Sequence, residues 1–396
     1  MTLDSIKWLY DRLFNIFIEF TLSLFIKKDE RLCILGLKPN TNKKDLFLHN
    51  TKYLFLYLSK IENIKTYWLC DDKKMIKEFY NRGYNNVIPR KSIKGIWLIL
   101  RAKYWFCDVT PNQVSKFNSI ISKSVFINLW HGTGGLKKVG FDAGEYSNNF
   151  IYNTLKPNIN YWIVNSEYEA NCRKTGFLAK DNEIKILGSP RLDVLYKDIP
   201  NAEIFMEEDF NKIKIFKSEG KKLIIYMPTF RDTGKDISSW LKSSKLQKVL
   251  KNNNTILLCK LHPYDKTKIE FSNKSYVYKI ANESDVYPIL KYTNGLITDY
   301  SSIYFDYLHL DKPIIYHIPD LEEYTNQCRG FYRPYETLTA GIYTKTEEDL
   351  LNAISNVITG IDNYKEKRKT LLDEMFVYQD GNNCERVANW IESLDK

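Results

Sequence analysis

The chain has 396 residues, which is more than one ordinary hydrophobic core accommodates, so two domains are expected. A hydrophobic content of 44% with 14% aromatic residues excludes an intrinsically disordered protein. The net charge of +10 favours anionic partners, namely nucleotides, phosphate polymers, anionic lipids or nucleic acid. The seven cysteines are scattered without a Cys-x-x-Cys pair, which is typical of reduced core thiols in a cytoplasmic protein, and the five histidines show no zinc-ligand spacing.

Residues 1–30 carry the pattern of an amphipathic helix. Polar residues recur at every third or fourth position, and apolar residues such as Trp8, Phe14 and Phe17 cover most of the remaining surface. Charges interrupt the apolar surface too often for a membrane-spanning helix, and there is no signal-peptide cleavage pattern. We expect a helix that lies in a membrane interface, with packing against the protein's own body or a second subunit as the alternative.

From residue 31 to residue 200, short apolar runs alternate with helical patterns. The expected helices are residues 50–60, 74–81, 93–102 and 166–175, and the expected strands are residues 32–35, 66–70, 104–109, 125–130, 161–165 and 184–187. Strands and helices that alternate at these lengths predict a parallel sheet covered by helices. Residues 31–200 are therefore expected to form a Rossmann-like N-terminal domain.

The polar segment 197–220 is expected to link two domains, because the alternation of strands and helices starts again after it. Strands are expected at 222–227, 255–261, 276–280, 295–298 and 314–316, and helices at 347–359 and 364–375. Residues 201–375 then form a second Rossmann-like domain, and the helix within residues 376–396 packs back toward the first. Two such domains predict an α/β protein with GT-B-type glycosyltransferase architecture.

The stretch from residue 124 to residue 140 places a titratable side chain at the end of a buried strand. His131 follows the apolar run 125–130 directly, and Gly132, Thr133, Gly134 and Gly135 come next. Glycines let a ligand approach the backbone closely, and open α/β sheets bind ligands at the carboxyl ends of their strands. A structural histidine that caps a glycine turn is the alternative.

In the second half of the chain, polar groups follow three predicted strands and converge at one edge of the sheet. Hydroxyls and free backbone N–H groups at the start of the helix that follows residue 302 suit a phosphate. Each group also has a structural alternative: Ser301 and Ser302 could cap the helix, His262 could occupy a turn, and Arg231 could form a surface ion pair. Asp306 is expected to support the loop, His309 and His317 to be structural, and His49 to lie at the surface or in packing. The polar groups are Thr229, Arg231, Lys260, His262, Thr298, Asp299, Ser301 and Ser302.

Motifs spread over about residues 125 to 335 resemble those of the CDP-glycerol glycerophosphotransferases of teichoic acid synthesis. The resemblance departs at Gly134 and Gly135, where the family more often has a proline before the leucine. The motifs, in chain order, are Trp130-His131-Gly132-Thr133, Gly188-Ser189-Pro190-Arg191-Leu192-Asp193, Pro228-Thr229-Phe230-Arg231, Lys260-Leu261-His262-Pro263, Thr298-Asp299-Tyr300-Ser301-Ser302 with Phe305-Asp306-Tyr307, and Arg329-Gly330-Phe331-Tyr332.

The resemblance implies a cytoplasmic enzyme, peripheral on the inner face of the cell membrane, that transfers glycerol phosphate from CDP-glycerol to a lipid-linked acceptor in teichoic acid or capsule synthesis. An acceptor hydroxyl attacks the β-phosphorus of the donor and CMP leaves. By resemblance, His131 is the general base and His262 is the second catalytic histidine, which helps to hold the pyrophosphate. The residues expected to bind substrate are Gly132, Thr133, Arg191, Thr229, Arg231, Lys260, Asp299, Ser301, Ser302 and Arg329.

Several alternatives stay open at this stage. The donor could be CDP-ribitol, or the chain could be a nucleotide-sugar glycosyltransferase, which would release a nucleoside diphosphate instead of CMP. A non-catalytic basic protein that binds nucleic acid or an anionic surface is disfavoured, because no basic stripe with interleaved aromatic residues is present. No metal ligands are assigned and no cofactor is firmly implied. No Asp-x-Asp pair is placed for Mg²⁺, although Asp299 leaves a metal open.

Overall fold

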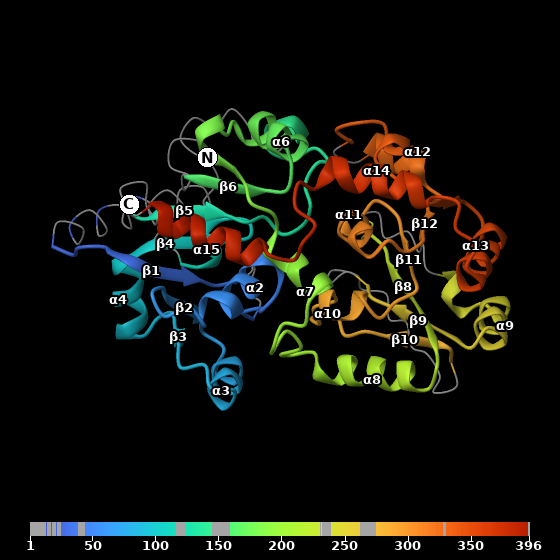
Figure 1. Cartoon of the computed structure of the whole chain (residues 1–396), viewed down its shortest axis with the longest axis horizontal. Helices are drawn as coiled ribbons and strands as arrows, with labels where there is room; N and C mark the ends of the chain where they lie inside the picture. The colour runs from blue at the N-terminus through green and yellow to red at the C-terminus, as the bar shows by residue number, and fades with distance from the viewer. Residues whose placement is uncertain are drawn as a thin grey trace. The chain divides into compact units, whose positions relative to one another are not determined.

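The computed structural model describes residues 13, 17, 21, 25–38, 44–115, 123–144, 159–229, 231, 239–261, 275–327 and 330–394. The chain divides into two compact units (Figure 1). Unit 1 comprises Met1–His131, Val139–Asp193 and Asn382–Lys396, and unit 2 comprises Gly132–Lys138 and Val194–Gly381. Apart from a few positions, the helix expected within residues 1–30 lies outside the described residues.

The described part of unit 1 contains a sheet of seven parallel strands in the order β3-β2-β1-β4-β5-β6-β7. Its central strands β1 and β4 are apolar and buried over their carboxyl-terminal four residues, 32–35 and 104–107, as expected of a parallel sheet that is covered on both faces. The strands are β1 (Asp29–Leu35), β2 (Lys65–Cys70), β3 (Val87–Pro89), β4 (Ala102–Cys107), β5 (Val125–Asn128), β6 (Tyr161–Val164) and β7 (Ile184–Ile186).

Helices connect these strands. Side chains cap three of them: Asp72 accepts hydrogen bonds from the N–H groups of Lys74 and Met75, Ser92 accepts one from Gly95, and Ser166 accepts one from Glu169. The helix at the end of the chain packs beside the first helix of unit 1 (Figure 1). The helices are α2 (His49–Leu58), α3 (Lys73–Asn81), α4 (Ile93–Arg101), α6 (Glu167–Phe177) and α15 (Asn383–Leu394), with 3₁₀ turns η1 (Pro111–Gln113), η2 (Gly140–Ala143), η3 (Asp181–Glu183) and η4 (Pro190–Leu192).

The described part of unit 2 contains a second parallel sheet, of six strands in the order β10-β9-β8-β11-β12-β13. Its main core cluster joins the strands to α9 and α13, through residues such as Ile224, Leu257 and Ile354. The strands are β8 (Lys222–Met227), β9 (Thr255–Cys259), β10 (Val277–Lys279), β11 (Gly295–Thr298), β12 (Ile314–His317) and β13 (Ile342–Thr344).

The helices of unit 2 include one within the segment that the sequence marks as a link. Helix α8 buries Asp209 and Ile213, and Asp209 accepts hydrogen bonds from Tyr278 and Ser284. The helices are α7 (Asp193–Tyr196), which starts at the last residue of the middle segment of unit 1, α8 (Glu207–Ser218), α9 (Ser244–Asn252), α10 (Tyr287–Leu290), α11 (Ile303–Tyr307), α12 (Leu321–Gln327), α13 (Glu347–Thr359) and α14 (Lys365–Met375), with η5 (Ser239–Lys242), η6 (Leu308–Leu310) and η7 (Tyr335–Thr337).

The predicted parallel α/β architecture is confirmed in both units. The expected strands and helices are present with ends shifted by a few residues, whereas β3, β13, α7, α8, α9, α10 and α12 were not expected. The two strands are three residues long and helices α7 and α10 are four residues long, so their patterns are weak. Helix α9 has apolar residues at helical spacing, so the sequence does contain a signal for it. The described cysteines are buried thiols, as predicted.

Candidate active site

His131 stands on a tight turn at the carboxyl end of β5 in unit 1. The preceding residue, Trp130, has a φ of +58°, which is rare for a residue other than glycine. Asn128 Oδ1 accepts a 2.8 Å hydrogen bond from Trp130 N–H, and Asn50 Nδ2 donates to the carbonyls of Leu129 (2.8 Å) and Trp130 (2.7 Å). Two buried asparagines therefore hold the backbone that presents His131.

The imidazole of His131 is held by a hydrogen bond at one ring nitrogen, and the residue is exposed to solvent. One ring nitrogen donates a hydrogen bond to the backbone carbonyl of Asp108, which leaves the other nitrogen with a lone pair. Desolvation lowers the pKa of His131, and nearby charges on His49, Arg173 and Arg191 lower it further. The ring is exposed to solvent, and hydration limits this decrease. The ring is therefore neutral at neutral pH and able to accept a proton.

Asp108 lies fully buried after β4 and supports the same turn. Its carboxylate accepts hydrogen bonds from the Thr51 hydroxyl (2.5 Å) and the Thr51 N–H (3.2 Å) at the start of α2. Burial raises the pKa of Asp108 to about 7, and these hydrogen bonds and the charge of Arg191 oppose the rise. The backbone of Asp108 thus orients His131 while its side chain fastens α2.

Two buried arginines accompany the turn. Arg191, expected from the motif to bind substrate, is fully buried, and its N–H donates to Asn50 Oδ1 at 3.0 Å. Arg173 forms a buried 2.8 Å ion pair with Glu169, and its guanidinium lies over the Trp130 ring at 4.2 Å. The contact of Arg191 with Asn50 is made by its backbone N–H, so its main chain supports the asparagine behind the turn.

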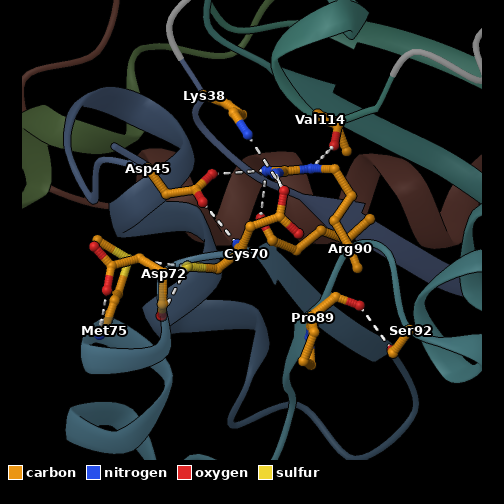
Figure 2. Close-up of polar contacts among 11 residues, drawn as sticks. Lys38, Asp45, Cys70, Asp72, Met75, Pro89, Arg90, Ser92 and Val114 are labelled. Atoms are coloured by element: carbon orange, nitrogen blue, oxygen red, sulfur yellow. Dashed lines mark hydrogen bonds and ion pairs between the residues drawn. The ribbon is translucent and has the colours of Figure 1, made fainter. Parts of the chain in front are cut away.

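A second polar network anchors the loops at the same edge of the sheet. The Arg90 guanidinium forms ion pairs of 2.8 Å with the carboxylates of both Asp45 and Asp71. Figure 2 shows Arg90 beside Asp45. Arg90 also donates to the carbonyls of Leu69 and Val114. Asp45 lies in the loop between β1 and α2, so Arg90 fastens the chain just before His49. The His49 and His131 rings lie 6.1 Å apart, centroid to centroid.

The glycine segment that follows His131 belongs to unit 2. It pairs with the chain after Gly330 through hydrogen bonds from Lys138 N–H to the Gly330 carbonyl and from Tyr332 N–H to the Leu136 carbonyl, both 3.1 Å. The Thr133 hydroxyl donates to Asp306 Oδ1 at 2.5 Å, and the Tyr287 hydroxyl donates to the other Asp306 oxygen. Asp306 therefore supports the loop, as expected.

Gly132 lies directly against the serines of the Thr298–Ser302 motif. A Cβ atom at Gly132 would stand 2.9 Å from the Ser302 hydroxyl, so the position requires glycine unless Ser302 moves. Ser301 and Ser302 are partly exposed, and α11 after them has only five residues. Gly132, Thr133, Ser301 and Ser302 therefore lie together in unit 2.

Arg231 and Asp299 form the centre of a buried ionic cluster. Arg231 donates to Asp320 (2.8 and 3.2 Å), to Asp299 Oδ2 (2.9 Å) and to the Thr229 carbonyl (2.7 Å). Its guanidinium lies over the rings of Tyr300 and Tyr324, which stack on each other at 3.9 Å. Burial raises the pKa of Asp299, and Arg231 opposes this rise. All three guanidinium nitrogens of Arg231 therefore donate hydrogen bonds to protein oxygens.

Lys260 follows β9 and uses its ammonium on the protein itself. It donates to the carbonyls of Ala281 (2.8 Å) and Asn282 (2.5 Å). Burial lowers its pKa to about 8, and Asp285 and Glu283 oppose the decrease. His262 and Arg329, both expected at the donor site, lie outside the described residues.

Sequence reasoning missed several groups that shape the two sites. Asp108 and Asp320 follow β4 and β12, so the rule that sites gather at the carboxyl ends of strands could have indicated them. Asn50 and His49 follow a loop without a strong pattern, and no sequence signal marks them. His309 and His317 hydrogen-bond with Tyr196 and Thr344 respectively, which fits structural roles.

The described residues contain no group of three or more His, Cys, Asp or Glu side chains that could hold a metal ion. Their helices are also too short or too polar for any of them to cross a bilayer.

Comparison with known proteins assigns the family. The family model described as CDP-glycerol:poly(glycerophosphate) glycerophosphotransferase matches residues 39–393. The chain is 27% identical to a teichoic acid poly(glycerol phosphate) polymerase of Bacillus spizizenii, over 90% of this chain and 93% of the relative. It is 30% identical to the teichoic acid glycerol-phosphate primase of Bacillus subtilis, over 77% of each chain. It is 31% identical to the teichoic acid ribitol-phosphate polymerase TarL of Staphylococcus aureus, over 74% of this chain and 52% of that protein.

Solved structures agree on the fold. A structure of the wall teichoic acid polymerase TagF superposes with a TM-score of 0.74 at 20% identity, covering 99% of this chain and 98% of the other. A UDP-GlcNAc 2-epimerase from Methanocaldococcus jannaschii gives a TM-score of 0.53 at 15% identity, covering 93% of this chain and all of the other. With the family model spanning most of its length, the chain belongs to the CDP-glycerol:poly(glycerophosphate) glycerophosphotransferases, a family of transferases.

Proposed function

We propose that the protein transfers glycerol phosphate from CDP-glycerol to a hydroxyl of a lipid-linked glycan or polyol-phosphate acceptor and releases CMP, in the synthesis of teichoic acid or a related surface polymer. The observation that carries this proposal is the His131 ring, which is fixed by the Asp108 carbonyl and open to solvent at the end of β5. We assign the acceptor to the domain of residues 31–200 and the CDP-alditol to the domain of residues 201–375.

In the proposed reaction, His131 acts as the general base. The lone-pair nitrogen accepts the proton of the acceptor hydroxyl as its oxygen attacks the β-phosphorus of the donor. The new O–P bond replaces the bond to the bridging oxygen, and CMP leaves with that oxygen. The neutral state of His131, which follows from its lowered pKa, supports this role.

On the donor side, the geometry divides the motif residues into two groups. Ser301, Ser302, Gly132 and Thr133 lie together and offer hydroxyl and N–H donors, so we assign them to the pyrophosphate. Arg231 and Asp299 are buried and paired, which favours a role in holding the loops of Thr229 and Tyr300.

Four motif residues remain to be assigned, namely Arg191, Lys260, His262 and Arg329. The Lys260 ammonium is committed to carbonyls of its own unit, which favours a positioning role. Arg191 contacts Asn50 through its backbone N–H, and the charge of its buried side chain acts on Asp108, so we assign it to support of the His131 turn. His262 and Arg329 keep their proposed places at the donor phosphates by resemblance. Hydrogen-bond donors fixed in advance stabilise the charge that develops on the leaving phosphate. No step is routed through a metal ion.

We propose that the protein is peripheral on the inner face of the cell membrane. Helix α4 supports this, because it carries apolar side chains on its outer side as well as toward the core: Ile93, Ile96 and Trp97 are 91%, 40% and 51% exposed. The exposed lysines Lys91 and Lys94 flank them. Apolar and aromatic side chains beside cations suit the interface of an anionic bilayer. The amphipathic pattern of residues 1–30 adds to this surface.

The test is CMP release by the purified protein from CDP-glycerol and, separately, from CDP-ribitol, with a lipid-linked acceptor pool. CMP from CDP-glycerol, lost in His131→Ala and His262→Ala, is the expected result. CMP from CDP-ribitol alone would make the protein a ribitol-phosphate transferase, which the relationship to TarL keeps as the second candidate. Release of a nucleoside diphosphate from a nucleotide sugar would replace the proposal with glycosyl transfer.

A further inference from the structure

A second imidazole lies beside the proposed base. The rings of His49 and His131 are 6.1 Å apart between centroids, at an interplanar angle of 62°. Both residues belong to unit 1, so their separation is a property of one compact body. His49 is partly exposed and His131 is exposed, so solvent reaches both rings. His49 is the first residue of α2, and nothing in its sequence surroundings marks it as functional.

The backbone of His49 adopts an unfavourable conformation that its surroundings impose. Its φ is +63°, in the left-handed region that residues other than glycine seldom occupy. Before it, Asp45 is held by Arg90 and by the N–H of Asp71 (2.7 Å) (Figure 2). After it, Asn50 binds the carbonyls of Leu129 and Trp130. These two anchors fix the distance between His49 and the His131 turn.

We propose that His49 forms a subsite of the acceptor end, where its imidazole binds the phosphate that precedes the attacking hydroxyl of a polyol-phosphate terminus. This inference rests on the proposed function, because it takes His131 as the group that meets the hydroxyl. One polyol unit separates the terminal hydroxyl from the preceding phosphate, so an acceptor whose hydroxyl meets His131 brings a phosphate close to it. The subsite selects acceptors that already end in a polyol phosphate over neutral ones.

A phosphate bound at His49 should change the basicity of His131, because charged groups near the ring act on it. The groups that act on the His131 ring are His49, Arg173 and Arg191, with the Asp108 carbonyl as hydrogen-bond acceptor. Arg173 is neutralised by Glu169, and Arg191 faces the buried carboxyl of Asp108. Protonated His49 opposes protonation of His131, so binding a phosphate at His49 offsets that charge and restores basicity to His131.

The first test measures binding without turnover. Calorimetric titration with a short synthetic poly(glycerol phosphate), in the absence of donor, compares the full-length wild type with His49→Asn. Asparagine tolerates a positive φ better than most residues, so the backbone is retained while the ring is lost. We expect affinity to fall about tenfold, the effect of removing one charge-assisted hydrogen bond. Equal affinity in the two proteins would overturn the proposal.

The matched control is Lys60→Asn, which removes an exposed cation beyond the opposite end of the same helix. It should leave the affinity unchanged. An equal loss in this variant would mean that the polyanion responds to net charge, and would also overturn the subsite.

The second test uses turnover and separates the subsite from general damage. His49→Asn should raise KM for the phosphate-bearing acceptor about tenfold and leave KM for CDP-glycerol and for a neutral alkyl glycerol acceptor unchanged. The acidic limb of kcat/KM should move to higher pH by about half a unit, because a cation beside His131 has been removed. A parallel rise in all KM values would indicate a structural role and reject the proposal. A wild type without CMP release would reject the proposed reaction, while the binding titration would still decide the subsite.

Discussion

The two units place their motif residues differently at the carboxyl edges of their sheets. In unit 1, the turn after β5 exposes His131, and the buried groups Asn50, Asn128 and Asp108 act on the backbone behind it. In unit 2, the turns after β8 and β11 bury Arg231 and Asp299, where they bind each other and Asp320. The sheet edge of unit 1 thus exposes a motif side chain to solvent, whereas the sheet edge of unit 2 buries its charged motif side chains in ion pairs that hold the loops.

This difference teaches that a motif residue at a strand end need not be a ligand. A buried guanidinium with two carboxylates, two aromatic faces and a carbonyl is already satisfied, and releasing it for a phosphate would leave charges unpaired. An exposed imidazole with one nitrogen committed has little structural duty. Substitution at the two places should therefore separate loss of chemistry from loss of stability.

The largest effect is expected for His131→Ala. Removal of a positioned general base lowers turnover by about 10²–10⁴-fold. Because the ring is exposed, the melting temperature should stay within a degree or so of the wild type. CMP release and thermal unfolding of the same preparation measure both quantities. Full turnover in this variant would mean that another group takes the proton.

Arg231→Ala should instead lower the stability of the protein more than any other substitution considered for the two motif sites. It leaves Asp299 and Asp320 buried without their cation, which costs about 3–5 kcal/mol of folding free energy. Chemical denaturation measures this loss. The matched control is Arg333→Ala, which breaks a partly exposed pair with Glu374 and should cost at most about 1 kcal/mol. If Arg231→Ala unfolded like the control yet lost donor binding, Arg231 would be a phosphate ligand after all.

Sequence patterns predicted the sheets and the glycine turn because both depend on local features. Runs such as residues 222–227 are apolar throughout, and His131-Gly132 interrupts such a run abruptly. They could not predict that Arg231 meets Asp320, which lies 89 residues away, or that Asn50 reaches the Trp130 carbonyl across 80 residues. Those contacts depend on the strand order, in which β1 lies beside β4 and β8 beside β11. The motifs therefore indicate which residues lie at the sites, whereas the strand order determines which of their side chains are engaged by other protein groups.

The pH dependence of stability tests the buried state of Asp108, whose backbone carbonyl orients His131. Its pKa is about 7 in the folded protein against 3.8 for an aspartate exposed to water, so the folded state binds the proton more tightly. The contribution of this group to stability is therefore present below about pH 4 and is lost as the pH rises toward 7. Asp108→Asn should flatten that part of the stability curve, and the backbone carbonyl that orients His131 remains. Melting temperatures measured across this range for both proteins provide the check, and parallel curves would contradict the assigned pKa.

The smallest effect tests whether unit 1 also differs from unit 2 at its surface. The double variant Ile93→Gln with Trp97→Gln removes the exposed apolar side chains of α4, and glutamine keeps the helix propensity. Because the core side of α4 is Gly95, Leu98 and Ile99, folding should be unaffected. Sedimentation with vesicles that contain phosphatidylglycerol should show at least about tenfold weaker binding, since each buried apolar side chain contributes about 1.5–3 kcal/mol.

The matched control for that measurement lies in unit 2. Ile361→Gln with Val377→Gln removes two exposed apolar side chains, at 50% and 55% against 91% and 51% for Ile93 and Trp97, and should leave vesicle binding unchanged. Replacing Lys91 and Lys94 by Gln should weaken binding about fivefold for each charge on anionic vesicles and leave phosphatidylcholine vesicles unaffected. Equal losses in the two apolar variants would mean that any exposed apolar side chain suffices, and the surface of α4 would have no special part in membrane binding. A loss confined to α4 and its lysines would instead assign the bilayer to the unit that carries His131, so that the proposed base and a lipid-linked acceptor share one body.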